Sequence, residues 1–119
     1  MKHSIKTIYV VHHSHTDIGY TDLQERILDQ QEHYIHTALH MMQDSEKNSN
    51  FRWNCETYFC VERFFSKATE EEKNNFFHYV KTGQIGISAS YLNFTDLLDC
   101  VVYKKRLSEM KALFQAHGI

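Results

Sequence analysis

The chain has 119 residues, of which 42% are hydrophobic and 13% aromatic, a composition that fits one globular unit and excludes a disordered segment. Its formal net charge is −2, and lysine and arginine form no stripe, so we expect neither a nucleic-acid nor a membrane partner. The N-terminus lacks the apolar core of a secretory signal, and no apolar run is long enough to span a bilayer, which predicts a cytoplasmic protein.

The first predicted element is a strand over residues 5–11, which is rich in β-branched and aromatic residues. Histidines, a carboxylate and a glycine follow it in residues 12–20. Alternate side chains of an extended chain share a face, so His13, His15 and Asp17 would lie on one side of the strand end. One such histidine alone is typical of a solvated loop. The alternating trio favours a site for Zn²⁺ or another divalent ion.

A long helix and a second strand are predicted next. Residues 21–24 match a capping box, and apolar residues recur at helical spacing behind it. The polar stretch 45–50 ends this helix. The short segment 51–55 predicts a strand, with Glu56 just beyond its end.

The remaining chain predicts three helices and one strand. A helix over 58–65 is followed by a second capping box at residues 69–72, and Gly83 ends the helix that this box opens. Segment 84–90 predicts a third strand, and residues 98–116 predict a last helix.

This alternation of strands and helices predicts the α/β class, with three successive β-α units and parallel strands. Loops that follow parallel strands open on one side, so His13, His15 and Asp17 would share a face with Glu56 and with Asp96 in the loop after the third strand. Three strands leave two open sheet edges. We therefore expect residues 1–119 to be a single partial domain of a larger protein, capable of self-association through these edges.

The segment from His13 to Tyr20 resembles the first zinc-binding motif of the glycoside hydrolase family 38 α-mannosidases, a His-x-His-x-Asp-x-Gly-Trp-like pattern. Segments 51–57 and 77–85 also look like the N-terminal domain of that family, in the right order. The resemblance implies a seven-stranded β/α barrel, of which this chain would form the first part. It also implies a zinc ion that binds the mannose of an oligosaccharide or glycoside during cleavage.

The resemblance implies a role for each site residue. His15 and Asp17 would bind zinc, and His13 would support them without binding the metal itself. Tyr20 stands where the family usually has a tryptophan against the sugar ring, so it keeps a smaller aromatic face. Glu56 and Asp96 are the further carboxylates expected on this face, where we predict that they contact substrate.

Retaining glycoside hydrolysis needs a nucleophilic carboxylate and an acid/base carboxyl about 5 Å apart. The resemblance places the nucleophile after a fourth strand, beyond residue 119, so no catalytic residue is assigned here. The sequence thus predicts the N-terminal part of a zinc-dependent retaining α-mannosidase-like hydrolase, inactive by itself.

Two other functions fit the same residues. Metal-dependent amidohydrolase and phosphoesterase barrels can also begin with His-x-His after the first strand and use the metal to activate water, although Gly19 and Tyr20 favour the mannosidase pattern. A free-standing, non-catalytic α/β module that binds metal or sugar is the third hypothesis.

Overall fold

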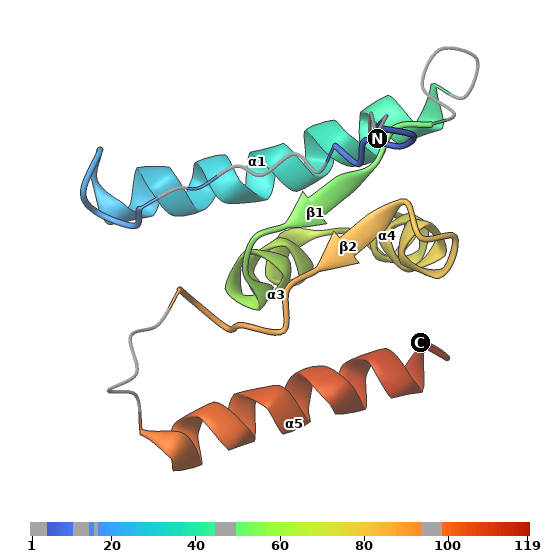
Figure 1. The fold of residues 1–119 in the computed structure, drawn as a ribbon. Helices are drawn as coiled ribbons and strands as arrows, with labels where there is room; N and C mark the ends of the chain where they lie inside the picture. Colours follow the sequence, from blue (N-terminus) through green and yellow to red (C-terminus); the bar gives the residue numbers. More distant parts are fainter. Residues whose placement is uncertain (1–4, 11–14, 16, 45–49, 94–98) are drawn as a thin grey trace.

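The computed structural model describes residues 5–10, 15, 17–44, 50–93 and 99–119. In Figure 1 two short strands lie in the middle, with the first helix on one side of them and the last helix on the other. In chain order, the elements are α1 (Gln24–Gln43), β1 (Trp53–Cys55), α3 (Tyr58–Lys67), α4 (Glu70–Lys81), β2 (Ile85–Ile87) and α5 (Cys100–Ala116).

The two strands pair in parallel, which confirms the predicted α/β class and strand direction. Trp53 lies opposite Ile85, and Cys55 lies opposite Ile87. Backbone hydrogen bonds extend the pairing at both ends: the Trp53 N–H donates to the Gln84 carbonyl at 2.9 Å, and the Ser88 N–H donates to the Cys55 carbonyl at 3.1 Å. The helices α3 and α4 form the crossover between the two strands.

The first predicted strand is not observed. Residues 5–10 form no strand, and all six are exposed, including Ile8 at 76% and Val10 at 89%. Val11 lies outside the described residues. β-Branched residues favour a strand only where a neighbouring strand and a covering layer bury them, and residues 5–10 have no such cover here. The three β-α units are therefore not formed within the described chain, which contains one parallel strand pair.

The predicted capping box at residues 21–24 is wrong, although the helix it was meant to open is present. Helix α1 begins at Gln24, and its N-cap residue Leu23 makes no side-chain cap. The Leu23 N–H instead donates to Asp22 Oδ1 at 2.7 Å. Gly19, with φ +90°, turns the chain just before, in a conformation that disfavours other residues.

The second predicted capping box is confirmed at the start of α4. The Glu72 N–H donates to Thr69 Oγ1 at 3.3 Å, and the Thr69 N–H donates to Glu72 Oε2 at 2.8 Å. Three acidic residues in the first turn face the positive end of the helix dipole. Gly83, with φ +73°, follows the end of the helix as predicted.

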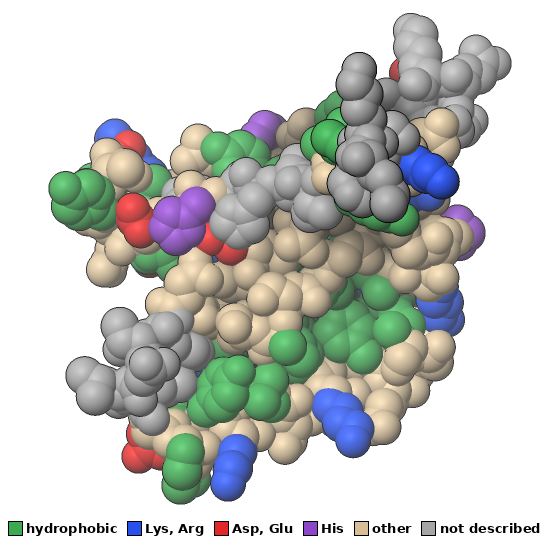
Figure 2. All heavy atoms as spheres, in the orientation of Figure 1, with side chains coloured by type: hydrophobic (Ala, Val, Ile, Leu, Met, Phe, Trp, Pro, Cys, Tyr) green, Lys and Arg blue, Asp and Glu red, His purple; other side chains and the backbone are tan. Residues whose placement is uncertain are grey.

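The core lies between α1, α3, α4 and the strands. Its most deeply buried side chains are large and apolar: Phe64, Phe76, Ile35, Val61 and Cys55. Helix α5 contributes no fully buried residue and rests on this core through Met110, Leu113 and Phe114. Figure 2 shows apolar side chains at the surface near α5. Among the described residues, no helix combines the length and the apolar character that crossing a bilayer requires.

A polar cluster joins α3, the segment after β2, and α5. The Tyr91 hydroxyl donates to Glu62 Oε2 at 2.5 Å, and the Arg106 guanidinium lies 4.8 Å from the centre of the Tyr91 ring. Burial of the phenol and its hydrogen bond to Glu62 raise the pKa of Tyr91 to about 12. Tyr91 thus fixes the segment that leaves β2 against α3.

Replacing Thr69 with alanine should lower the free energy of unfolding by about 1 kcal/mol, because it removes the side-chain acceptor of the cap. Chemical denaturation measures the change. The matched control is Thr21→Ala, in the box that does not form, and it should change the stability by less than about 0.5 kcal/mol. Equal losses in both variants would contradict the assignment.

Replacing Glu62 with glutamine should lower the pKa of Tyr91 below about 12, because it removes a negative charge that opposes ionisation of the phenol. A pH titration followed by NMR of the labelled tyrosine ring carbons, assigned with Tyr91→Phe, measures it. Glu71→Gln removes an exposed carboxylate elsewhere and should leave this pKa unchanged. An unchanged Tyr91 pKa in the Glu62 variant would contradict the role of the hydrogen bond.

Candidate functional site

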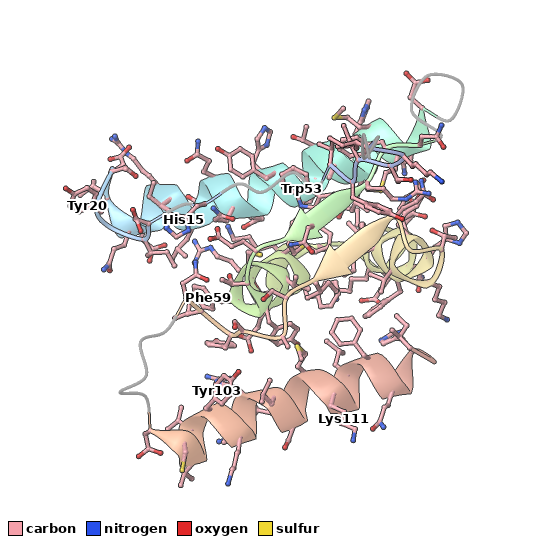
Figure 3. The ribbon with its side chains drawn as sticks, viewed as in Figure 1. His15, Tyr20, Trp53, Phe59, Tyr103 and Lys111 are labelled. Atoms are coloured by element: carbon pink, nitrogen blue, oxygen red, sulfur yellow. The ribbon has the colours of Figure 1, made fainter. Side chains whose placement is uncertain are left out.

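A cavity of about 240 Å³ lies at the ends of the two strands, on the side where the chain leaves them. Its wall is formed by the segment before α1, by α1 and α3, and by the segments after β1 and β2, and it includes His15, Asp17, Glu56, Phe59, Arg63 and Asn93. In Figure 3, His15 lies close to the N-terminal half of α1, and Phe59 lies at the start of α3.

Backbone hydrogen bonds bring the two strand exits together. The Tyr58 N–H donates to the Ser90 carbonyl at 2.9 Å, and the Phe59 N–H donates to the Tyr91 carbonyl at 3.0 Å. These N–H groups belong to the first turn of α3, where a helix has no internal acceptors for them. The segment after β2 therefore runs against the start of α3 and beside Glu56.

The imidazole of His15 lies between two carboxylates. Its Nδ1 is 2.5 Å from Glu56 Oε1, and its Nε2 is 3.1 Å from Asp17 Oδ1. The hydrogen bond to Glu56 and the charge of Glu56 raise the pKa of His15, and Asp17 adds to the effect. About half of the side chain is exposed in His15 and Asp17, whereas only 7% of the Glu56 side chain is exposed.

Asn93 completes this cluster and was missed as a site residue by the sequence analysis. Its Nδ2 donates to Glu56 Oε1 at 2.7 Å and lies 3.5 Å from His15 Nδ1. The sequence did offer one signal, since Asn93 is a polar residue in the predicted loop after the last strand. No sequence motif distinguishes a single asparagine in a loop from other polar loop residues, so the sequence did not predict its contact with Glu56.

Arg63 places a positive charge in the cavity wall. Its Nη2 is 2.8 Å from Asp29 Oδ1 and 3.0 Å from Glu25 Oε2, both on α1. The hydrogen bond from Arg63 lowers the pKa of Asp29. These ion pairs hold the guanidinium toward α1.

The donor atoms of His15 and Asp17 fit two ligands of one metal ion. Zinc binds imidazole nitrogen and carboxylate oxygen at about 2.0–2.2 Å, so two such ligands in a tetrahedral site lie about 3.3–3.6 Å apart. The observed separation of 3.1 Å is slightly shorter than this range. Within the described part of the chain, no group of three or more histidine, cysteine or acidic side chains could hold a metal ion. A further histidine, cysteine or carboxylate ligand would therefore come from outside these residues.

The structure brings together three of the predicted site residues, His15, Asp17 and Glu56. Tyr20 does not join them: its side chain lies in the turn before α1, is 88% exposed and does not line the cavity (Figure 3). The predictions for His13 and Asp96 lie outside the described residues.

Comparison with known proteins identifies the family. The family model for the "Glycosyl hydrolases family 38 N-terminal domain" matches residues 6–104, a range that includes the histidine motif, Glu56 and Asn93. No curated protein and no solved structure matches the chain. Because the family match covers most of its length, the chain belongs to glycosyl hydrolase family 38, in the N-terminal domain of that family.

Proposed function

We propose that this chain is the N-terminal part of a zinc-dependent retaining glycoside hydrolase that acts on α-mannosides. Membership of glycosyl hydrolase family 38 supports glycosidase activity for the complete protein. The observation that carries the zinc part of the proposal is the separation of 3.1 Å between His15 Nε2 and Asp17 Oδ1 at the cavity mouth.

In this proposal, residues 1–119 form part of a seven-stranded β/α barrel. The parallel pairing of β1 and β2 and the exposed apolar side chains of Ile5, Ile8 and Val10 support it, because further strands would cover both. Ile8 and Val10 are 76% and 89% exposed here, and in the proposed barrel a neighbouring element would bury them. Without that cover, the open edges would favour self-association.

His15 and Asp17 would hold the zinc ion, with at least one further ligand from beyond this chain, and His13 would support them. When bound, zinc supplies a Lewis acid that orients and polarises the sugar hydroxyls. The residues of this chain bind and orient: Tyr20, Glu56 and Asp96 are proposed to contact the sugar.

The nucleophile and the acid/base residue are proposed to lie beyond residue 119, so this chain alone should not hydrolyse a glycoside. Its carboxylates at the cavity are engaged with His15, as the contacts of Asp17 and Glu56 show. Retaining hydrolysis needs two carboxyl groups about 5 Å apart across the scissile bond, and this proposal takes both from beyond residue 119.

The complete protein should bind zinc, and His15→Ala and Asp17→Asn should each weaken binding by more than about tenfold, because each variant removes a proposed ligand. Isothermal titration with Zn²⁺ measures the affinity. His36→Ala is the matched control, because His36 also contacts a carboxylate, Glu72 at 3.0 Å, but lies away from the cavity. Equal affinity in all four proteins would contradict the metal assignment.

The complete protein should hydrolyse an aryl α-mannoside, and removal of zinc with a chelator should abolish the activity, whereas the 119-residue chain alone should show none. Release of the chromogenic aryl alcohol measures hydrolysis. Metal analysis supports the proposal if it finds one zinc ion per complete protein. Two metal ions per protein, or cleavage of an amide or phosphoester in place of the mannoside, would overturn it, as would zinc binding without hydrolysis.

A further inference from the structure

Part of the cavity wall comes from the two helices α1 and α3. Helix α1 supplies Leu28 and Gln31, and helix α3 supplies Phe59 and Arg63. Residues three or four positions apart lie on the same face of a helix, so each pair forms one side-chain surface that borders the cavity. None of these four side chains is of a type that binds zinc. This part of the wall would therefore contact a substrate and not a metal ion.

Phe59 gives the cavity wall an aromatic surface. Among the described residues that line the cavity, it is the one phenylalanine, tyrosine or tryptophan. Its ring is half-buried, and its centroid lies 5.5 Å from that of Tyr91, with 57° between the two ring planes. Figure 3 shows Phe59 and His15 at the same end of the molecule. An aromatic ring in such a wall can pack against the C–H groups of a sugar.

Arg63 gives the same wall a hydrogen-bond donor. Its Nη2 is bound by Asp29 at 2.8 Å and by Glu25 at 3.0 Å. Its Nε is buried and has no hydrogen-bond partner among the described residues. A buried N–H of a charged group without a partner is rare and unfavourable, and a bound water or ligand commonly accounts for it. The guanidinium thus retains donor capacity for an oxygen atom of a ligand.

Charge and size restrict the ligand that this wall fits. Asp29 and Glu25 already balance the charge of Arg63, and Asp17 and Glu56 add two further carboxylates to the wall. An anionic ligand would therefore be repelled, whereas a neutral ligand with hydroxyl groups would not. The cavity of about 240 Å³ is smaller than the sites of drug-sized ligands, which occupy about 300–1,000 Å³. These features fit a single neutral sugar ring.

We infer that Phe59 and Arg63 determine substrate specificity by holding one neutral hexose, with the Phe59 ring against its C–H groups and the Arg63 guanidinium donating to one of its oxygens. This inference deepens the proposed function and rests on it, because the hexose would be the mannose whose hydroxyls face His15 and Asp17. Gln31 lies beside them in the wall, with an amide that can both donate and accept.

Hydrolysis of an aryl α-mannoside by the complete protein tests the two residues. Arg63→Met keeps a long side chain but removes every donor, so it should raise KM by more than about tenfold. Phe59→Leu keeps an apolar side chain but removes the ring, and it should raise KM by about two- to tenfold. In both variants kcat should stay within about twofold, because the lost contact holds the bound substrate and the transition state alike.

Matched controls separate a substrate contact from a structural role. Lys67→Met removes another cation of α3 that contacts Asp29, at 3.3 Å, but does not line the cavity. Phe65→Leu removes a half-buried ring of α3 that packs on Phe76, with 5.2 Å between the centroids, away from the cavity. Both should leave KM within about twofold. Equal KM values in all five proteins, or a loss of kcat alone in the Phe59 and Arg63 variants, would overturn the inference.

Calorimetric titration of the complete protein with methyl α-mannoside and with its 6-phosphate tests the neutral ligand. The neutral sugar should bind more tightly, and Arg63→Met should weaken its binding by more than about tenfold. Tighter binding of the phosphate would overturn the inference.

The same titration keeps this inference separate from the proposed function. If the complete protein does not hydrolyse the mannoside, the proposed function fails. Titration with the methyl α-glycosides of mannose, glucose and galactose then decides the role of the wall. Binding of one of them that weakens in Arg63→Met and Phe59→Leu, but not in Lys67→Met, supports it. If none of the three binds, the inference is overturned.

Discussion

The parallel pairing of β1 with β2 is the constraint on which the candidate site depends. It places the residue after one strand, Glu56, beside the segment that leaves the other, where Asn93 lies. The register rests on three residue pairs and on the backbone hydrogen bonds between α3 and the segment after β2. A shift of one residue would turn each strand side chain to the opposite face, so the separation between Glu56 and Asn93 depends on this register.

Local signals predicted the helices well and the caps unevenly. Thr69 and Thr21 begin the same short pattern, yet only Thr69 caps a helix. The difference is the backbone that precedes them, because the turn at Gly19 and the hydrogen bond from Leu23 to Asp22 start α1 in another way. The strand predicted over residues 5–11 is absent from residues 5–10 for a related reason. Strand propensity depends on residue types alone, whereas a strand forms only beside a neighbouring strand.

The candidate site shows the same division between near and distant residues. Alternation along an extended chain predicted that His15 and Asp17 would share a face, and they are in contact. The topology predicted that Glu56 would lie on that side. Its hydrogen bond to His15, 41 residues away in the sequence, depends on the strand register, which no local pattern encodes. For Asn93 the sequence carried only its place in a loop, and its amide acquires a role through the fold.

The low burial of helix α5 affects how long the candidate site stays ordered. It buries no residue completely, so its local opening costs less free energy than opening of α3 or α4, and its amides should exchange with solvent first. Arg106 of α5 lies against the Tyr91 ring, two residues from Asn93. Local opening of α5 would remove that support, so the stability of the cavity wall depends on a helix that contributes no residue to the cavity itself.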